Sequence, residues 1–343
     1  MIKVGIIGAT GYTGEELINL LLKHPEVRIC YLSAKIQFPQ KISEIFKKFK
    51  ARIEIVCEEL NFEKVSSQCE LVFTALPHTV SMEIVPRLLN AKLKVIDLSA
   101  DYRLRNLKLY QRFYKKKHSD PYRIKEAVYG LPEIYRQDIK KASLVANPGC
   151  YPTAAILGIL PCLVADYIEL SDIIIDAKSG FTGAGRKLDL SYIFAEINEN
   201  LRAYKINTHQ HIPEIEERLS SFSSKKLNIN FVPHLVPLNR GILETIYLKK
   251  KKNKLNLKTE DLIKLYKRFY SKEPFIRIYD KESLPQVKDV VGTNFCDIGL
   301  YSEKNSSLII IIVAIDNLLK GASGQAVQNM NIMYGYPETT ALI

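Results

Sequence analysis

Cys150 lies in the segment Asn147-Pro148-Gly149-Cys150-Tyr151-Pro152-Thr153, and an apolar run with helical spacing follows from Thr153 to Leu160. We expect Pro152 at the first helical position, where a missing N–H costs nothing. Cys150 would then come just before a helix N-terminus, where backbone N–H groups and the helix dipole favour a thiolate. The pattern indicates a nucleophile. The alternative is a buried structural cysteine, the usual role of this residue type.

Two histidines supply a partner for such a thiol. His209 and His211 precede an expected helix opening at Pro213. If this segment is extended, both side chains point to the same side. Histidine can take or hold a proton near neutral pH, which a cysteine nucleophile requires. A metal pair is the alternative, but the sequence shows no third ligand at a suitable spacing. The sequence does not say which histidine is the base.

The N-terminal segment predicts a strand, a glycine turn and a helix. The β-rich run Ile2–Ile7 leads into glycines at positions 8, 11 and 14, and helical apolar spacing follows from Glu15 to Leu22. The first glycine permits a tight turn, the second lets a pyrophosphate approach, and the third lets the helix pack on the strand. N–H groups at the helix start would hold the phosphates. We therefore predict nucleotide binding rather than an ordinary strand-to-helix turn.

The end of the second predicted strand indicates which nucleotide binds. Val27–Leu32 is followed by Ser33-Ala34-Lys35, whereas sites that prefer NAD usually place Asp or Glu there. A hydroxyl and a cation suit the 2′-phosphate of NADP. The alternative is a solvated loop with an incidental lysine.

Other loops offer groups for an anion. Ser179–Lys187 is a glycine-rich, basic loop after a predicted strand, and its N–H groups and Arg186 are suited to a phosphoryl or carboxylate group. Ser99 and Arg103 follow the predicted strand Lys94–Leu98, at the edge where ligands of such sheets bind. Each loop can instead be an ordinary surface turn.

Composition limits the class of protein. A chain of 343 residues is long for one hydrophobic core, and its six cysteines lack the CxxC spacing of zinc sites, which suits a reducing cytoplasm. No apolar run approaches the ~20 residues of a membrane helix. The net charge is +12, with lysine runs at 115–117 and 249–252. These runs lack the interleaved aromatics of a nucleic-acid site, so we interpret them as solvated loops and expect no nucleic-acid or membrane partner.

The elements that must position these groups fall into two regions. Strand-like runs at Leu71–Ala75, Lys94–Leu98 and Ser143–Ala146, with a helical stretch at Val80–Asn90, predict a Rossmann-type, doubly wound parallel sheet over residues 1–149. Residues 150–315 carry longer β-rich runs and fewer helices, which predicts an α+β domain for catalysis and oligomerisation. We expect the small-residue segment 316–343 to be a C-terminal helix that completes the first domain.

These groups together indicate one chemistry. A nicotinamide site, an activated cysteine, a histidine and anion-binding loops fit the reduction of an acyl group through a thioester. The basic loops indicate phosphate as the leaving group.

Several motifs resemble those of the N-acetyl-gamma-glutamyl-phosphate reductase family, within the semialdehyde dehydrogenase superfamily. They are Gly8–Gly14, Leu76-Pro77-His78, Asp97–Arg103, Asn147–Thr153, Ser179–Arg186, His209–Glu216 and Asp316–Asn329. The resemblance implies NADPH-dependent reduction of N-acetyl-L-glutamyl 5-phosphate to N-acetyl-L-glutamate 5-semialdehyde with release of phosphate, in cytoplasmic arginine biosynthesis. Thr79 and Phe181 depart from it, since we expect Gly and a smaller residue there, and Thr182 replaces an expected Ser.

The resemblance also implies roles for particular residues. Cys150 is the implied thioester nucleophile, one of His209 and His211 the acid–base group, and Asn317 a neighbour of the nicotinamide. With the patterns above, the cofactor-binding residues are Gly8, Thr10, Gly11, Tyr12, Thr13, Gly14, Ser33, Lys35, Pro77, His78, Ser179, Gly180, Gly183 and Asn317. The substrate- or phosphate-binding residues are Ser99, Arg103, Asn147, Arg186 and Tyr204. We expect no metal, and a homo-oligomer (dimer or tetramer) formed through the second domain.

Four alternatives remain open. Aminoadipyl-phosphate reductase and aspartate-semialdehyde dehydrogenase use the same chemistry, and one methylene in a pocket discriminates weakly. The HxHxPE segment favours the glutamyl-type family over the aspartate enzyme. A nucleotide-sensing protein that has lost its chemistry, or a basic nucleic-acid-binding protein, would be a different class. The intact Cys150 and both histidines argue against a sensing protein.

Overall fold

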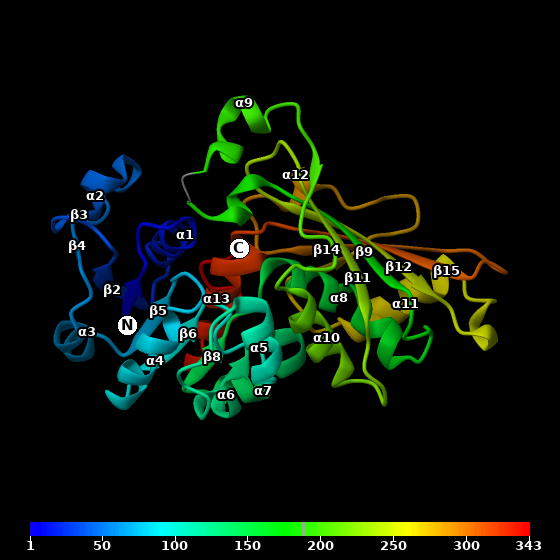
Figure 1. The fold of residues 1–343 in the computed structure, drawn as a ribbon, viewed down its shortest axis with the longest axis horizontal. Coiled ribbons are helices and arrows are strands. Elements are labelled where there is room, and N and C mark those ends of the chain that lie inside the picture. Colours follow the sequence, from blue (N-terminus) through cyan, green and yellow to red (C-terminus); the bar gives the residue numbers. More distant parts are fainter. Residues whose placement is uncertain (187–188) are drawn as a thin grey trace. The chain divides into compact units, whose positions relative to one another are not determined.

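The computed structural model describes residues 1–186 and 189–343. The chain forms two compact units (Figure 1). One, here called the N-terminal unit, contains Met1–Pro148 and Ala322–Ile343; the other, the central unit, contains Gly149–Gly321. Each unit is described by itself below.

The N-terminal unit is built on an eight-stranded sheet of order β3-β4-β2-β1-β5-β6-β8-β7. Its strands are β1 (Ile2–Ile7), β2 (Val27–Ser33), β3 (Gln40–Lys41), β4 (Val56–Glu58), β5 (Leu71–Thr74), β6 (Lys94–Asp97), β7 (Val128–Tyr129) and β8 (Leu144–Ala146). All neighbouring strands are parallel except β3 and β4. β5 is buried along its whole length, as expected for a strand covered on both faces. Its carboxyl end and that of β1 meet at the same edge, which is where such sheets bind ligands.

The helices of this unit connect the strands. They are α1 (Tyr12–Leu21), α2 (Ile42–Ile45), α3 (Phe62–Gln68), α4 (Ser81–Asn90), α5 (Leu107–Tyr114), α6 (Arg123–Glu126), α7 (Pro132–Lys141) and α13 (Gly324–Tyr334), with a 3-10 turn at Lys47–Phe49. α13 packs against α1 and α7. The helix expected over 316–343 is shorter than predicted, because α13 covers only Gly324–Tyr334. A π-helical turn at Leu319–Ser323 precedes it, and Gly335, with φ of 74°, ends it.

The central unit contains a seven-stranded mixed sheet of order β10-β11-β9-β12-β15-β14-β13. Its strands are β9 (Ile173–Ser179), β10 (Arg202–Ala203), β11 (Ile229–Leu235), β12 (Ile242–Lys249), β13 (Ile276–Ile278), β14 (Cys296–Ser302) and β15 (Leu308–Ile315). The helices are α8 (Cys150–Val164), α9 (Phe194–Ile197), α10 (Ile212–Ser220), α11 (Thr259–Phe269) and α12 (Val287–Val290), with 3-10 turns at Phe181–Ala184, Leu190–Tyr192 and Lys252–Lys254. The doubly wound parallel sheet of the N-terminal unit is Rossmann-like, and the mixed sheet of the central unit with its helices is α+β. Together they confirm the predicted fold class.

Strand alternation gives this sheet two different faces. Side chains such as Ile175, Ile246 and Ile311 are buried, and α8 packs on β12 and β15. Because successive side chains point to opposite faces, their neighbours Ile174 and Tyr247 lie on the other face. Register places Ile174 beside Tyr247, Tyr247 beside Ile310, and Ile310 beside Tyr301. These four residues form a stripe across four strands, here called the apolar stripe, in which Ile174 and Tyr301 are 39% and 48% exposed.

Candidate active site

The glycine turn of the N-terminal unit has the geometry of a phosphate-binding loop. Gly8 has φ of 93°, and its N–H donates to the Ser33 carbonyl over 2.8 Å. A Cβ on Gly14 would lie 2.3 Å from the Gly8 carbonyl oxygen, so only glycine lets α1 approach β1 this closely. A Cβ on Gly11 would meet nothing nearer than 3.6 Å. Gly11 is the N-cap of α1, whose first N–H groups have no intrahelical acceptor. The turn, including Thr10, Tyr12 and Thr13, can therefore hold a pyrophosphate.

β2 ends at Ser33, beside this turn, and Lys35 follows two residues later. The Ser33 hydroxyl is buried, and it is among the described side chains that make no hydrogen bond. Lys35 is exposed. An unsatisfied buried hydroxyl and a nearby cation fit a ligand that brings hydrogen-bonding groups and negative charge, such as the 2′-phosphate of NADP.

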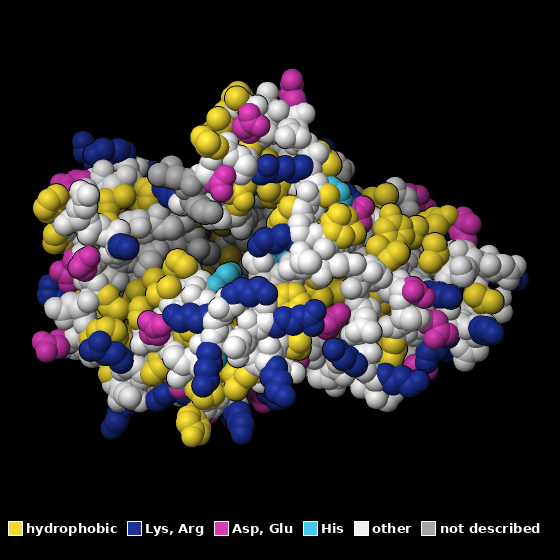
Figure 2. Space-filling view, viewed as in Figure 1, with side chains coloured by type: hydrophobic (Ala, Val, Ile, Leu, Met, Phe, Trp, Pro, Cys, Tyr) yellow, Lys and Arg dark blue, Asp and Glu magenta, His cyan; other side chains and the backbone are white. Residues whose placement is uncertain are grey.

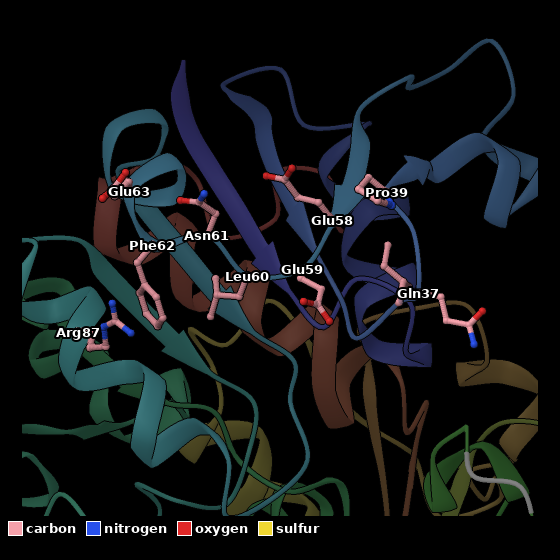
Figure 3. Close-up of a pocket in the computed structure, with 10 residues that line it drawn as sticks. Gln37, Pro39, Glu58, Glu59, Leu60, Asn61, Phe62, Glu63 and Arg87 are labelled. Carbon is pink, nitrogen blue, oxygen red and sulfur yellow. The ribbon is translucent and has the colours of Figure 1, made fainter.

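A pocket of about 610 Å³ lies at the carboxyl ends of β2 and β4 (Figure 3). Its lining includes Leu60 and Phe62, and the Arg87 guanidinium lies 3.4 Å from the centre of the Phe62 ring. Glu59 and Gln37 lie at its other side (Figure 3). Apolar walls with a few polar groups are typical of a site for a small organic ligand.

Ser99, Arg103 and Asn147 are more buried than the sequence indicated. The Ser99 hydroxyl donates to Asp97 over 2.7 Å. Arg103 donates to the carbonyls of Asn147 and Leu98, each over 2.7 Å. Asn147 donates through Nδ2 to the Ala322 carbonyl over 3.0 Å. These side chains hold the loops of the N-terminal unit, and their direct contact with substrate stays a prediction.

The central unit places Cys150 at the very start of α8. Helix α8 begins at Cys150 with Gly149 as its N-cap, so Pro152 is the third helical residue rather than the first. The first three N–H groups of a helix all lack intrahelical acceptors, so proline is tolerated at each. The Gly149 N–H donates to the buried Glu214 carboxylate over 2.9 Å. A Cβ on Gly321 would lie 2.7 Å from the Cys150 Cβ, so glycine there leaves room around the thiol.

His209 and His211 lie together, although their segment is a turn and not the extended strand we considered. Their ring centres are 4.7 Å apart, and both side chains are buried. The His211 backbone N–H donates to His209 Nδ1 over 3.1 Å, so the proton of the neutral His209 ring lies on Nε2. A tight turn that precedes α10 brings the rings together, not strand alternation.

Tyr151 connects these groups to Tyr204. Its ring packs edge-on against His209 and His211, and its hydroxyl lies 3.2 Å from the Tyr204 hydroxyl. Burial raises the pKa of both phenols, and the negative charge of a Cys150 thiolate raises them further. Both tyrosines therefore stay protonated at neutral pH, and because one hydroxyl donates to the other, one phenol proton is left to donate beside Cys150.

The glycine-rich loop follows β9. Gly180 donates its N–H to the Gly241 carbonyl over 2.9 Å, and a Cβ on Gly180 would lie 2.8 Å from the Arg240 nitrogen. Asn317 accepts from the Gly241 N–H over 2.7 Å and donates to the Thr182 hydroxyl over 3.0 Å. The loop also contains Ser179, Gly183 and the exposed Arg186, while Lys187 lies outside the described residues. Asn317 is thus in a turn after β15, not in the last helix.

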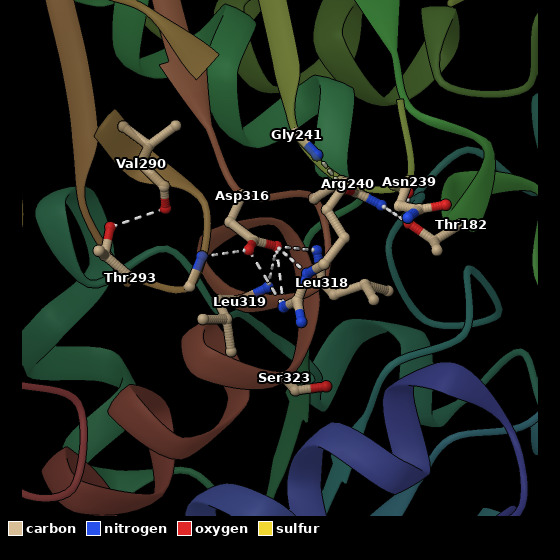
Figure 4. Close-up of polar contacts among 12 residues, drawn as sticks. Thr182, Asn239, Arg240, Gly241, Val290, Thr293, Asp316, Leu318, Leu319 and Ser323 are labelled. Carbon is tan, nitrogen blue, oxygen red and sulfur yellow. Dashed lines mark hydrogen bonds and ion pairs between the residues drawn. The ribbon is translucent and has the colours of Figure 1, made fainter. Parts of the chain in front are cut away.

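Asp316 holds this region together (Figure 4). Its carboxylate is fully buried and accepts from the N–H groups of Leu318 at 2.8 Å, Leu319 at 3.1 Å and Gly292 at 2.8 Å. It also pairs with the Arg240 guanidinium at 3.1 Å. Asp316 therefore connects two segments: the turn after β15 that contains Asn317, and the segment with Arg240 and Gly241 that contacts the glycine-rich loop.

Sequence reasoning missed three members of this site. Tyr151 and Glu214 lie inside motifs that we singled out, but only the structure shows what they contact. Arg240 lies directly before Gly241, and its partner Asp316 is 76 residues away. A charged residue next to a glycine turn was the available signal.

Two classes of feature are absent from the described residues. No cluster of three or more His, Cys, Asp or Glu side chains among them is arranged to hold a metal ion. No helix within residues 1–186 and 189–343 combines the length and apolar character needed to cross a membrane.

Comparisons with known proteins connect both units to one family. A family model described as semialdehyde dehydrogenase, NAD binding domain, matches residues 3–142, and one described as semialdehyde dehydrogenase, dimerisation domain, matches residues 150–317. An aspartate semialdehyde dehydrogenase II from Vibrio cholerae has a similar fold, with a TM-score of 0.71, 17% identity and coverage of 98% of this chain and 99% of that chain. The Candida albicans aspartate semialdehyde dehydrogenase with NADP has a TM-score of 0.74 and 18% identity, with coverage of 97% of this chain and 98% of that chain.

Curated relatives are much more similar in sequence. The N-acetyl-gamma-glutamyl-phosphate reductase of Lachnoclostridium phytofermentans is 47% identical over 342 residues, which covers 100% of this chain and 98% of that protein. The enzyme of the same name from Citrifermentans bemidjiense is 48% identical over 343 residues, with the same coverage. These matches confirm the resemblance seen in the motifs. The chain belongs to the N-acetyl-gamma-glutamyl-phosphate reductase family of the semialdehyde dehydrogenases.

Proposed function

We propose that this chain reduces N-acetyl-L-glutamyl 5-phosphate to N-acetyl-L-glutamate 5-semialdehyde with NADPH and releases phosphate, as a step of arginine biosynthesis. The names of relatives about 47% identical along the full chain support this substrate. The observation that carries the chemistry is Cys150 at the first position of α8, beside two protonated tyrosines. The six cysteines, all described, are thiols and not disulfides, which supports a reducing cytoplasmic location.

The first half of the reaction forms a thioester. The Cys150 sulfur, as a thiolate, attacks the acyl carbon, a C–S bond forms, and the C–O bond to phosphate breaks. The start of α8 stabilises the thiolate through its N–H groups and dipole. Glu214 fixes the Gly149 N–H and with it the direction in which α8 begins. The hydroxyl of Tyr204 is suited to donate a hydrogen bond to the developing oxyanion.

The second half releases the aldehyde. When bound, NADPH would supply a hydride to the thioester carbon, and one histidine of the pair would donate the proton that completes a thiohemiacetal on Cys150. The same histidine then accepts the hydroxyl proton as the C–S bond breaks, so that the aldehyde forms and Cys150 leaves as a thiolate. His209 has its Nδ1 occupied by a backbone N–H, so Nε2 is the nitrogen with which it can take part. Arg186 and the N–H groups of the glycine-rich loop are suited to the departing phosphate.

The N-terminal unit would hold the cofactor. The turn Gly8–Gly14 takes the pyrophosphate, Ser33 and Lys35 the 2′-phosphate, and the pocket around Leu60 and Phe62 the adenine ring. Lys35→Glu should weaken NADPH far more than NADH, because it places a negative charge beside the phosphate that only NADPH carries. Fluorescence titration with both cofactors tests this, and equal losses would contradict a 2′-phosphate site at Lys35.

The central unit would form the oligomer through the apolar stripe. A family model named for dimerisation covers this unit, and the stripe places Ile174, Tyr247, Ile310 and Tyr301 side by side on one face. Tyr247→Glu should give a monomer in sedimentation analysis, while Phe222→Glu, a change at an exposed aromatic outside the stripe, should not. A Tyr247→Glu protein with the wild-type mass would exclude this face. The number of subunits comes from the same measurement.

An assay in the oxidative direction tests the function. Purified protein is given N-acetylglutamate semialdehyde, NADP and inorganic phosphate, beside the aminoadipate and aspartate semialdehydes. We expect phosphate-dependent NADPH formation, strongest with the acetylglutamate compound. Cys150→Ser should abolish it with little change in NADPH affinity, whereas Cys30→Ser, at a half-buried cysteine of the other unit, should not. A preference for another semialdehyde would refute the substrate, and NADPH binding without turnover would indicate a sensing protein.

A further inference from the structure

Thr79 has a backbone conformation that its side chain disfavours. Its φ is 72°, in the left-handed region, where a β-branched residue is rare. It follows His78 and precedes α4, and the family resemblance leads us to expect glycine at this position. The loop begins at Ala75, whose carbonyl oxygen would lie 2.2 Å from a Cβ on Gly8. Thr79 therefore ends a loop that lies against the phosphate-binding turn.

Asp101 holds the amide side of this residue. The buried carboxylate accepts from the Thr79 N–H over 2.7 Å and from the Met82 N–H, in the first turn of α4, over 3.0 Å. The Tyr110 hydroxyl donates to the same carboxylate over 2.7 Å. Asp101 thus fixes both Thr79 and the start of α4 from a distant loop.

Lys116 holds the carbonyl side. Its ammonium donates to the Thr79 carbonyl over 3.1 Å and to the Glu83 carboxylate over 2.6 Å. Lys116 belongs to the lysine run 115–117, which we interpreted from sequence as a solvated loop. Lys and Arg side chains gather over α5–α7 in Figure 2, and the run follows α5 directly in the chain. One of its members nevertheless has a specific backbone contact.

His78 shares this network. Its Nδ1 accepts from the Ala100 N–H over 3.1 Å, and its ring packs edge-on against Tyr114, with ring centres 5.4 Å apart. Tyr114 stacks on Tyr110 at 4.8 Å, and Tyr110 donates to Asp101. The position of His78 is therefore connected to the group that fixes Thr79.

We propose that Asp101 and Lys116 are positioning residues for the loop that ends at Thr79. They hold Thr79 in the left-handed conformation from both of its peptide groups, and this keeps Pro77 and His78 in place beside the phosphate-binding turn. The proposal rests on the proposed function, in that this loop binds NADPH. With glycine at position 79 the chain reaches the same conformation without help, so the contacts from Asp101 and Lys116 are no longer needed to hold it.

A double-mutant cycle tests this dependence. NADPH affinity is measured by fluorescence for the wild type, Thr79→Gly, Asp101→Ala and the double variant. Asp101→Ala should weaken NADPH by roughly tenfold with threonine at position 79 and by less than about threefold with glycine there. Thr79→Gly alone should leave the affinity within about twofold. Without cofactor, Asp101→Ala should speed hydrogen exchange of peptides covering residues 75–84 in the threonine background, and it should do so less in the glycine background.

Lys116 gives a second cycle that does not disturb the core. Lys116→Met should weaken NADPH by roughly threefold in the threonine background and not in the glycine background. Lys117→Met, at an exposed lysine of the same run, is the matched control and should have no effect. Equal losses in both backgrounds would overturn the proposal, since a residue that only stabilises α4 or Tyr110 is indifferent to residue 79. Failure of the wild type to bind NADPH would instead contradict the proposed function.

Discussion

Asp316 offers a quantitative test of how the central unit is held together. Asp316→Asn keeps the size of the side chain but removes its charge and replaces one oxygen by an N–H₂ group. That group must then face either the Gly292 N–H or the N–H groups of Leu318 and Leu319, so one set of donors loses its acceptor. The Arg240 guanidinium loses its ionic partner at the same time.

The expected loss follows from the burial of the pair. Asp316 is 0% exposed and Arg240 is 23% exposed. Removing one partner of a buried ion pair typically costs about 3–5 kcal/mol, and the partial hydration of Arg240 places this case near 3 kcal/mol. Arg240→Met should cost less, because the Asp316 carboxylate still accepts three backbone N–H bonds. The ordering of the two variants is therefore part of the prediction.

Urea unfolding followed by far-UV circular dichroism measures these losses. Hydrogen exchange at residues 290–293 and 316–321 shows whether they arise at Asp316. Glu260→Gln, in the exposed ion pair with Lys281, is the control and should leave the free energy of unfolding nearly unchanged. A loss below about 1 kcal/mol for Asp316→Asn, or a larger loss for Arg240→Met, would refute the reasoning.

Three further predictions concern single side chains. Burial raises the pKa of Glu244 well above its ordinary value of 4.5, so as pH rises above 4.5 the unfolded chain releases this proton first and the folded protein loses stability. Glu244→Gln should remove this part of the pH dependence of urea unfolding. An unchanged pH dependence in that variant would contradict the prediction. Gly14→Ala, whose Cβ would lie 2.3 Å from a carbonyl oxygen, should lower both stability and NADPH affinity, whereas Gly11→Ala should lower only the affinity, as thermal unfolding and titration can show. Glu214→Ala should cost about 1.5–3 kcal/mol through the lost bond from the Gly149 N–H and slow alkylation of Cys150 by iodoacetamide; an unchanged alkylation rate would argue against a positioning role.

Local patterns predicted most of the elements that position the site. Glycines at 8, 11 and 14 had three different expected roles, and the space around each one agrees with its role. The strands and helices could also be predicted, because burial on one or both faces gives the sequence a periodic pattern of apolar residues. Boundaries were less accurate, as α8 shows by starting at Cys150.

Long-range contacts could not be predicted in the same way. Ser99 and Arg103 looked like ligand-binding groups from their place after a strand, but burial and the loop partners that occupy them depend on the whole fold. The histidine rings meet because of a turn, which a spacing of two residues does not distinguish from a strand. The Asp316–Arg240 pair joins residues that are far apart in sequence, so no local pattern reports it.

The buried hydroxyl of Ser33 links folding to ligand affinity. A polar group that is removed from water without a protein partner destabilises the ligand-free protein by about 1–3 kcal/mol. A ligand that supplies the missing partner recovers this free energy on binding, without having to strip water from the hydroxyl first. Selection for a more stable ligand-free protein and selection for tighter cofactor binding would therefore favour different residues at this position. The same position can thus set how strongly the cofactor protects the chain against unfolding.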